Sequence, residues 1–437
     1  MEVATAAEEL APGAVEDALG NSAGGQGSLP RGAGRSYGDT AVNGGGRSLS
    51  TGRLGRILAW DQERGEIEAE AGVTLGQLCD RVAAAGWIVP CCPGTARVTL
   101  GGMVASDVHG KNHAHTGTLG EHVLGLTLVR SDVGSIRCSP TEHPELFRAT
   151  LGGLGLTGVI ESVRLRLLPL AGDRVSVERI RCRSLESVLA LLRQHDRYDY
   201  GLAWVDSFSI KPAKVNSASA RCLVLRATVV PGHGQGSGAG PRALRMTGAL
   251  ARFTPPFLFR RATMRLVNRA YFSAPTGSAA TRPLGSFLFP QDEAHDTNHL
   301  YGARGAYAHH SWIPAGEDPA VHELLRRAAQ PGAQSLVTVL KAFGGKHRDA
   351  PGLLSFTGSG TSIALGFVNE GDRTRRQLDA LDAIVLDAGG KLYPAKDARM
   401  SAASFARSFP RVQEFARHVD PALSSNFWRR VAPEAVP

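Results

Sequence analysis

The sequence predicts an α+β protein of two domains, and three observations support this prediction. The chain has 437 residues, which is more than a single hydrophobic core usually fills. Its composition, 43% hydrophobic and 20% charged, is typical of a folded globular protein. Before Pro169, strand-like alternation of apolar and polar residues is interrupted by helical patterns, and the composition changes after this residue. We expect a first domain over residues 1–172, a second over 173–389, and a return to the first over 390–437.

The individual elements follow from the spacing of apolar residues. In residues 66–71 apolar residues alternate with glutamates, which is typical of a strand with one solvated face. Thr74 is a suitable N-cap for the helix that follows. Alternation returns in residues 124–128 and 163–167, which we expect to be strands. After Pro169 the same reasoning predicts helices over 184–196 and 373–388, a turn-rich loop over 231–241, and strands over 203–209, 222–230, 335–343 and 361–367.

Charge and cysteine content narrow the function classes. The net charge of +9 is mild for this length, and no dense Lys/Arg run is interleaved with aromatic residues. We therefore expect no nucleic-acid partner and favour an anionic substrate or cofactor. The six cysteines form no CxxC pair, which favours reduced thiols in a cytoplasmic protein. Because no signal-like start and no long apolar run is present, we expect a soluble protein, or at most peripheral membrane contact.

A formal GxGxxG pattern lies at Gly153, Gly155 and Gly158. In a Rossmann unit this pattern follows a strand and opens a helix, so that the helix N-terminus meets the pyrophosphate. Here a helical segment precedes the glycines and a strand-like segment follows them. We therefore do not expect a Rossmann fold.

The segment RGAGRSYGDTAVNGGG, residues 31–46, is the first glycine-rich stretch that carries chemistry. Its glycines allow successive backbone N–H groups to converge on an anion, and Arg35 adds positive charge. From the residues alone, a pyrophosphate cradle and an ordinary glycine-rich turn both remain open.

A second glycine-rich stretch, PGTARVTLGGMVASDVHGKNHAH, spans residues 93–115 and carries three histidines. We expect no metal site there, because the stretch has no thiolate and only one acidic residue, Asp107. Neutral histidines and Lys111 beside a redox cofactor or a sugar hydroxyl suit this composition better.

Together with ELFRATLGGLGLTGVIESV, these stretches resemble the FAD domain of the vanillyl-alcohol-oxidase superfamily, a PCMH-type FAD-binding domain. The chain is most similar to the family of decaprenylphosphoryl-β-D-ribose 2′-oxidases, the flavin subunits of ribose-to-arabinose epimerases. The motifs RSYGD, HGKNH, GLTG and YxAKD carry the likeness, which spans residues 29–169 and resumes at FLFPQDEAHDTNHLYGARG, VLKAFGG, LSFTGSG and GGKLYPAKDAR. The resemblance implies a substrate domain with an antiparallel sheet flanked by helices.

The resemblance also implies an FAD that runs extended across the first domain. Residues 32–39 would wrap the pyrophosphate, the second glycine-rich stretch would line the ring system, and Ile160 would support the adenine side. Related alditol and aldonolactone oxidases often bond the flavin to a histidine of the first loop; Arg35 occupies this place, so we expect noncovalent FAD. The implied FAD-binding residues are Arg31, Gly32, Ala33, Gly34, Arg35, Ser36, Tyr37, Gly38, Asp39, Pro93, Gly94, Thr95, Thr99, Gly101, Gly102, Ser106, His109, Gly117, Ile160 and Tyr393.

The implied reaction moves a hydride from a carbinol carbon to the flavin, while a base or hydrogen-bond network accepts the hydroxyl proton. The lysine of YxAKD maps to Lys396. Desolvation lowers its pKa enough for proton transfer, or its ammonium holds the alcohol oxygen and the flavin edge; both roles remain open. The implied catalytic residues are Lys396, Lys111, His109 and Tyr37, and the implied substrate-binding residues are Lys341, His310, Ser362, Ala364 and Lys396.

Departures from the mycobacterial members of this family lie on the substrate side. Ala308 and His310 stand where those relatives carry two glutamines, and Ser362 and Ala364 stand where they carry an asparagine and a cysteine. We expect flavin chemistry to persist, whereas the identity of the sugar is less constrained.

A segment without acidic residues runs from Arg242 to Arg282. Arg261, Arg265 and Arg269 recur every four residues and would share one face of a helix. Such a basic amphipathic stretch suits a lipid surface or a prenyl phosphate. A solvated helix face over the second domain is the other open interpretation.

These observations predict an FAD-dependent oxidoreductase that oxidises a secondary sugar hydroxyl to a ketone. Our first expectation for the substrate is C2′ of a phosphoribosyl group linked to a polyprenyl phosphate, with a short-chain reductase partner completing an epimerisation. A soluble sugar, polyol or nucleoside-like metabolite remains open as the substrate. A flavin-binding or ligand-binding protein without turnover is the third hypothesis, and the retained Lys396, Lys341 and Lys111 argue against it.

Overall fold

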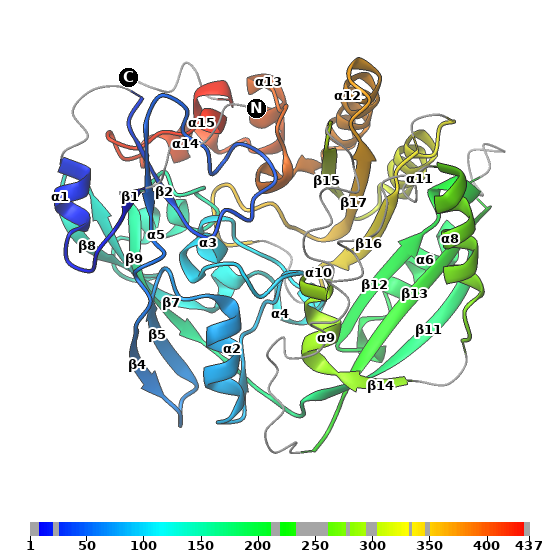
Figure 1. Cartoon of the computed structure of the whole chain (residues 1–437), viewed down its shortest axis with the longest axis horizontal. Coiled ribbons are helices and arrows are strands. Elements are labelled where there is room, and N and C mark those ends of the chain that lie inside the picture. The colour runs from blue at the N-terminus through cyan, green and yellow to red at the C-terminus, as the bar shows by residue number, and fades with distance from the viewer. Residues whose placement is uncertain are drawn as a thin grey trace.

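A computed structural model of the chain forms two lobes, each built on a β-sheet, that lie side by side in Figure 1. The expected α+β class is confirmed, because antiparallel sheets and helices combine in both lobes. Most of the turn-rich loop over 231–241 and residues 242–260 of the acid-free segment lie outside the described residues. The structure describes residues 8–20, 26–210, 219–232, 261–276, 280–293, 304–331, 334–345 and 350–431.

A five-stranded antiparallel sheet organises the first lobe. Ile67 and Ala69 of its second strand are buried. Glu66 and Glu68, which alternate with them, lie on the other face, as the sequence pattern predicts. In sheet order the strands are β4 (Ile57–Asp61), β5 (Glu66–Glu70), β9 (Val159–Arg166), β7 (Val123–Arg130) and β8 (Gly134–Cys138). Two small sheets pair β1 (Glu8–Glu9), β3 (Arg47–Ser50) and β2 (Ser28–Arg31), and β6 (Trp87–Ile88) with β10 (Leu168–Pro169).

Helices cover the inner face of this sheet. Thr74 caps α2 as predicted, and Gln77 completes a capping box with it. Apolar side chains of α2 and α3 share one core with β5, β7 and β9, and this core also holds Cys79, Cys91 and Cys92 as free thiols. The helices of the lobe are α1 (Val15–Gly20), α2 (Leu75–Ala83), α3 (Leu100–Ala105), α4 (His113–Thr116) and α5 (Pro144–Thr150).

An eight-stranded antiparallel sheet forms the second lobe. Its last strand is formed by Lys391 and Leu392, which we expected to belong already to the return to the first lobe. The limits of the domains remain a prediction. In sheet order the strands are β14 (Ala280–Pro283), β11 (Arg174–Ser184), β13 (Ser219–Val230), β12 (Tyr200–Val205), β16 (Val337–Phe343), β17 (Gly360–Val368), β15 (Ala306–Pro314) and β18 (Lys391–Leu392).

The two faces of the large sheet have different neighbours. On one face, Ile180 and Cys182 of β11 pack into the core with α6, α11 and α12. On the other face, Arg179 and Arg181 donate hydrogen bonds to carbonyls of α8 and of the residue that follows it. The helices of this lobe are α6 (Leu185–Leu192), α8 (Arg261–Ser273), α9 (Leu284–Leu288), α10 (Pro290–Glu293), α11 (Asp318–Ala328) and α12 (Asp372–Asp387). The segment that holds Arg261, Arg265 and Arg269 is helical, as α8, so the condition under which these arginines would share a face is met.

The chain then returns to the first lobe. In Figure 1 the segment from α13 to α15, coloured orange to red, lies beside β1 and β2. Asp420 accepts hydrogen bonds from the backbone and hydroxyl of Ser131, and Arg430 forms an ion pair with Asp39. The helices are α13 (Ala402–Ser408), α14 (Val412–Ala416) and α15 (Asn426–Val431).

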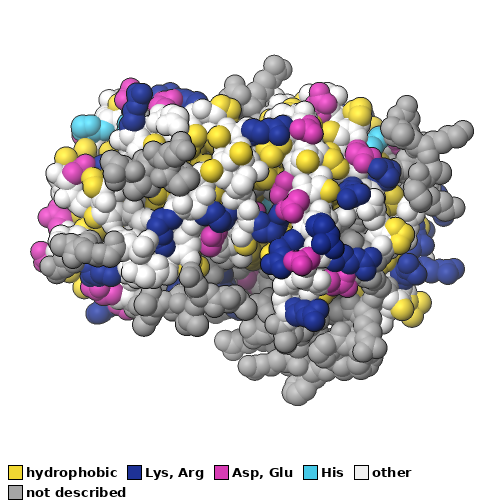
Figure 2. Space-filling view, turned by 90° about the horizontal axis from the view of Figure 1, so that it is seen from above, with side chains coloured by type: hydrophobic (Ala, Val, Ile, Leu, Met, Phe, Trp, Pro, Cys, Tyr) yellow, Lys and Arg dark blue, Asp and Glu magenta, His cyan; other side chains and the backbone are white. Residues whose placement is uncertain are grey.

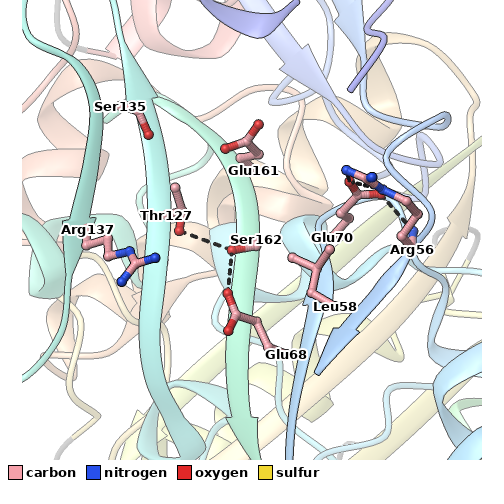
Figure 3. Close-up of a pocket in the computed structure, with 9 residues that line it drawn as sticks. All are labelled: Arg56, Leu58, Glu68, Glu70, Thr127, Ser135, Arg137, Glu161 and Ser162. Atoms are coloured by element: carbon pink, nitrogen blue, oxygen red, sulfur yellow. Dashed lines mark hydrogen bonds and ion pairs between the residues drawn. The ribbon is translucent and has the colours of Figure 1, made fainter. Parts of the chain in front are cut away.

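Figure 3 shows a polar groove of about 460 Å³ on the outer face of the five-stranded sheet. Two pairs of its lining residues are hydrogen-bonded: Arg56 donates to Glu70, and Ser162 donates to Glu68. The sheet separates this groove from α2 and α3, because buried residues of the same strands point the other way. The lining residues are Arg56, Leu58, Glu68, Glu70, Thr127, Ser135, Arg137, Glu161 and Ser162.

The surface in Figure 2 carries dark-blue Lys and Arg side chains interspersed with magenta Asp and Glu. This mixture fits the modest net charge of +9. Among the described residues, no helix combines the length and the apolar character needed to cross a bilayer.

The first glycine-rich loop is wedged between two other segments. A Cβ on Gly32 would lie 2.1 Å from Oγ1 of Thr99, the N-cap of α3, and a Cβ on Gly38 would lie 1.4 Å from the carbonyl oxygen of Asp397. The backbone N–H of Tyr37 donates to the carbonyl of Ala395 at 2.9 Å. Glycine is therefore required where this loop meets the C-terminal segment.

This packing predicts the effect of a single added methyl group. Gly38→Ala should lower the free energy of unfolding by about 1–3 kcal/mol, because the backbone of Asp397 cannot yield as a flexible side chain would. Gly55→Ala is the matched control, since a Cβ there meets no atom within 4 Å. Urea unfolding of the two variants tests this; equal stability of both would contradict the close packing.

Candidate active site

Side chains from three neighbouring strands form the floor of the site. In register, Lys341 of β16 lies opposite Ser362 of β17, and Ala364 of β17 lies opposite His310 of β15. Residues two apart on a strand share a face, so all four side chains project from the same face of the sheet. The His310 Nε2 and the Ser362 Oγ are 2.8 Å apart and share a hydrogen bond. The structure therefore brings together all the sheet residues that the resemblance implies for substrate.

An aromatic cluster faces this floor. His109, which the resemblance implies as catalytic, is buried with its ring centroid 5.4 Å from that of His310. Its Nδ1 is buried and has no hydrogen-bond partner among the described residues. The rings around it are Phe343, Phe356 and Tyr393, at 4.9, 5.7 and 5.6 Å.

Lys396 approaches from the C-terminal segment. It ends a short 3-10 turn, Pro394–Lys396, in which the carbonyl of Ala395 accepts a hydrogen bond from the backbone N–H of Tyr37 in the glycine-rich loop. The Nζ of Lys396 lies 3.3 Å from the ring centroid of Tyr37, which is cation–π distance. Because Tyr37 is 58% exposed, its ring presents an aromatic face beside the ammonium. The structure thus brings the YxAKD and RSYGD motifs into contact, while the roles of both residues toward a flavin remain a prediction.

Lys111 occupies a different position from the other two lysines. Its Nζ donates to the carbonyl of Leu288 at 2.6 Å and lies 5.6 Å from the ring of Phe287, both in α9. The following residues contact the second glycine-rich stretch, because Asp292 accepts from Thr95 and from the backbone of Ala96. Lys111 thus joins α9 to the second glycine-rich stretch.

Among the described residues, the site combines several basic side chains, and no acidic side chain forms an ion pair with Lys111, Lys341 or Lys396. Burial lowers the pKa of Lys341 to about 8 and, with repulsion from Lys341, that of Lys396 to about 8. Burial first, then repulsion from Lys341, lowers the pKa of Lys111 to about 7. Burial and the same repulsion hold the pKa values of His109 and His310 well below the ordinary value, so both imidazoles are neutral at pH 7. Such a site favours an anionic ligand.

The turn that carries His109 is organised by the buried carboxylate of Asp107, which entered the sequence-based argument only as the one acidic candidate for a metal ligand in this stretch. Asp107 accepts from the backbone of Gly120 at 2.8 Å and from Ser355 Oγ at 2.5 Å, and its own φ is +38°. Burial raises its pKa to about 6 despite these bonds. Among the described residues, no group of three or more His, Cys, Asp or Glu side chains is arranged to hold a metal.

The residues present fit a flavin. The first loop offers half-buried glycine backbone beside the exposed Arg35, and the Tyr37 ring offers an apolar face. The buried Nδ1 of His109 has no hydrogen-bond partner in the part of the chain that the structure describes. Tyr393 donates its hydroxyl to the carbonyl of Ser106, the residue after α3, which places two more implied residues in contact. The cations near His310 and Lys396 suit a ligand with negatively charged oxygen or nitrogen edges.

Several implied FAD-binding residues have structural partners of their own. The carboxylate of Asp39 is bound by Arg430, 2.7 Å away, so it fixes the loop to α15. Ile160 lies in the apolar core of the first lobe, and Gly117 has φ +66° below the side chain of Glu121. Gly101 packs against Ala71, where a Cβ would lie 2.8 Å from another Cβ. Their direct contact with FAD remains a prediction.

The sequence analysis missed other side chains of the site. His113 stacks on Phe343 with centroids 4.1 Å apart, and Phe356 stands 4.6 Å from Tyr393. Gln291 packs on Gly94, and its backbone N–H donates to that residue's carbonyl. The motifs LSFTGSG and FLFPQDE contained Phe356 and Gln291, but no spacing rule assigned a role to either residue.

Comparison with known proteins agrees with this geometry. Residues 21–139 match the family of the FAD binding domain. The chain is 31% identical to decaprenylphosphoryl-β-D-ribose oxidase of Mycolicibacterium smegmatis over 93% of its own length and 90% of that protein. It is 31% identical to an uncharacterized Streptomyces coelicolor protein, over 82% of the chain and all of that protein. A shorter match, 33% identical over 27% of the chain and 26% of the relative, is to L-gulonolactone oxidase of Scyliorhinus torazame.

The lowered lysine pKa values predict a pH dependence of stability for the FAD-free protein. Below about pH 7 the buried lysines are charged in the folded and the unfolded chain, so folding carries the full cost of burying them. Between the folded pKa of Lys341, about 8, and its ordinary value of 10.5, the unfolded chain binds more protons, so the free energy of unfolding contributed by this group rises with pH.

Lys341→Met should therefore stabilise the FAD-free protein at pH 7 by about 1–3 kcal/mol, and this gain should shrink toward pH 10. The exposed Arg53→Met is the control for a charge removed elsewhere. Urea unfolding at pH 7, 8.5 and 10 measures the difference between each variant and the wild type. A gain that does not depend on pH, or a loss at pH 7, would contradict the assigned electrostatics.

Proposed function

Because the chain belongs to the decaprenylphosphoryl-β-D-ribose oxidase family, and is thus an FAD-dependent oxidoreductase, we propose that it oxidises C2′ of a lipid-linked phosphoribosyl group to a ketone. The observation that carries this proposal is the group of cations at the large sheet. Lys341 acts electrostatically on Lys111, Lys396, His109 and His310, and in each of these groups this repulsion lowers the pKa further than burial alone. A sugar bearing a phosphate supplies the missing negative charge.

The chain's own residues perform the proton chemistry. A bound FAD would supply the acceptor for the hydride of the carbinol carbon. With a pKa of about 8, Lys396 is partly neutral near physiological pH and accepts the proton of the sugar hydroxyl. Tyr37 holds the Lys396 side chain by its ring, and the neutral His109 and His310 offer hydrogen bonds without competing for a charge.

His310 of β15 and Ser362 of β17 suggest a second candidate substrate for the same type of reaction. His310 and Ser362 are hydrogen-bonded to each other at 2.8 Å, at positions where the mycobacterial relatives differ. An imidazole held in this way can bind a hydroxyl that a different sugar presents. A soluble sugar, polyol or nucleoside-like metabolite is therefore the alternative substrate.

Two partners belong to the proposal. A ketone at C2′ becomes an epimer only when a second enzyme, of the short-chain reductase type, returns a hydride to the opposite face. A polyprenyl-linked substrate also requires contact between the protein and a membrane surface.

Noncovalent FAD is tested first, by the absorption spectrum before and after acid precipitation. We expect the yellow colour to remain in the supernatant, because Arg35 cannot form the bond that a histidine forms. Anaerobic titration with a polyprenyl-phosphoribose analogue should then bleach the flavin, whereas free pentoses should not. Bleaching by a soluble sugar alone would favour the alternative, and a colourless protein that takes up no FAD would overturn both.

Lys396→Ala should leave the flavin bound but slow its reduction by the sugar at least about 100-fold, because a positioned proton acceptor contributes about 10²–10⁴-fold. Lys391→Ala is the matched control, since this lysine lies in the same segment and donates to the carbonyl of Ser355. Stopped-flow bleaching of both variants measures the rate. Unchanged reduction in Lys396→Ala would show that another group accepts the proton, and no reduction in the wild type would favour a binding protein without turnover.

A further inference from the structure

Helix α8 carries apolar side chains on the side that faces away from the protein. Leu266 is 69% exposed and Val267 is 49% exposed, whereas Asn268 and Phe272 are buried. Asn268 donates to the buried carboxylate of Asp206 at 2.8 Å, so a polar side chain anchors the helix inward. The usual amphipathic arrangement, with apolar residues inward and polar residues outward, is therefore partly reversed.

Arginines border this apolar face. Arg265 and Arg269 lie on one flank of Leu266 and are exposed, and the described residues of α8 include no acid. Arg179 and Arg181 of β11 add positive charge at the C-terminal end of the helix, where they bond to the carbonyls of Tyr271 and Phe272. Among the described residues, this face thus combines exposed leucine and valine with arginine, which complements an anionic lipid surface.

The same side of the large sheet connects α8 to the active site. Tyr271 of α8 lies 5.0 Å, centroid to centroid, from Trp204 of β12. In register, Trp204 lies opposite Val339, Val339 opposite Ala364, and Ala364 opposite His310. A row of half-buried, mostly apolar side chains therefore crosses four neighbouring strands between the helix and the substrate floor.

We propose that α8 docks on an anionic bilayer surface, with Leu266 and Val267 in the apolar boundary and Arg265 and Arg269 at the lipid phosphates. The delivery of substrate by this surface rests on the proposed lipid-linked substrate. The docking itself does not, because it needs no substrate. The row from Trp204 to Ala364 then lies between the membrane and His310, and a prenyl chain follows it while the sugar phosphate reaches the lysines.

The test is flotation of the purified, FAD-loaded full chain with vesicles of phosphatidylcholine containing phosphatidylglycerol, and with vesicles of phosphatidylcholine alone. We expect binding to the anionic vesicles that weakens as salt rises. Leu266→Glu should reduce binding at least about tenfold, and Arg265→Gln with Arg269→Gln roughly 25-fold, or about fivefold for each arginine removed. The proposal would be overturned if binding did not depend on lipid charge or if all α8 variants bound like the wild type. A wild-type protein that bound neither kind of vesicle would overturn it as well.

Matched controls separate this surface from general effects of the same substitutions. Val133 is 61% exposed on the first lobe, so Val133→Glu changes an equally exposed apolar residue; Arg53→Gln removes an exposed charge. Both should bind vesicles like the wild type. Equal losses in these controls would show nonspecific adsorption and overturn the assignment to α8.

A second measurement distinguishes the docking surface from the proposed function. In solution, a short-chain phosphoribosyl analogue should bleach the flavin of Leu266→Glu at the wild-type rate, whereas a polyprenyl substrate embedded in anionic vesicles should bleach it much more slowly. If vesicle binding depends on α8 but neither substrate bleaches the wild type, the docking stands and the proposed substrate fails. If the variant is as fast as the wild type on embedded substrate, α8 does not deliver it.

Discussion

The close approach of three backbone segments is the constraint on which the rest of the site depends. The loop from Arg31 to Asp39 has no room for a Cβ at Gly32, against Thr99, or at Gly38, against Asp397. These contacts fix the start of α3 and the Lys396 turn relative to one loop, although the three segments are far apart in the sequence. Arg430 reinforces the arrangement from α15 by binding Asp39. The position of Tyr37 over Lys396 is a consequence of this packing.

The electrostatics of the site depend on where two nearby carboxylates are bound. Asp107, two residues before His109, accepts hydrogen bonds from Gly120 and Ser355. Asp397, which follows Lys396, accepts from the backbone of Arg399 and Met400. Desolvation therefore lowers the pKa of Lys341, and desolvation together with repulsion from Lys341 lowers that of Lys396. A protein carries such a cost at a functional site, where a ligand supplies the opposite charge.

Sequence reasoning predicted the elements better than it predicted the partners of the site residues. The alternation in β5, the Thr74 cap and the arginine-bearing helix α8 are local patterns, so spacing alone indicated them. The motifs brought Tyr37, His109, Lys341 and Lys396 into one site, because a family resemblance carries long-range contacts that local patterns lack. What the sequence could not indicate were contacts between unrelated segments, such as Lys111 with Leu288, His113 with Phe343 and Arg430 with Asp39.

The two histidines of β15 show how one strand serves both stability and chemistry. His309 is buried, and its Nε2 lies 3.0 Å from Asp382 of α12, whose other oxygen binds Arg399, three residues after Lys396. His310, one residue on, faces the site and bonds to Ser362. Because side chains alternate along a strand, a change at His310 alters the substrate side without disturbing the link between β15, α12 and the lysine turn. Neighbouring positions of β15 therefore serve different parts of the molecule: His309 joins the strand to α12 and, through Asp382, to Arg399, whereas His310 shares its face of the sheet with Ser362 and Lys341.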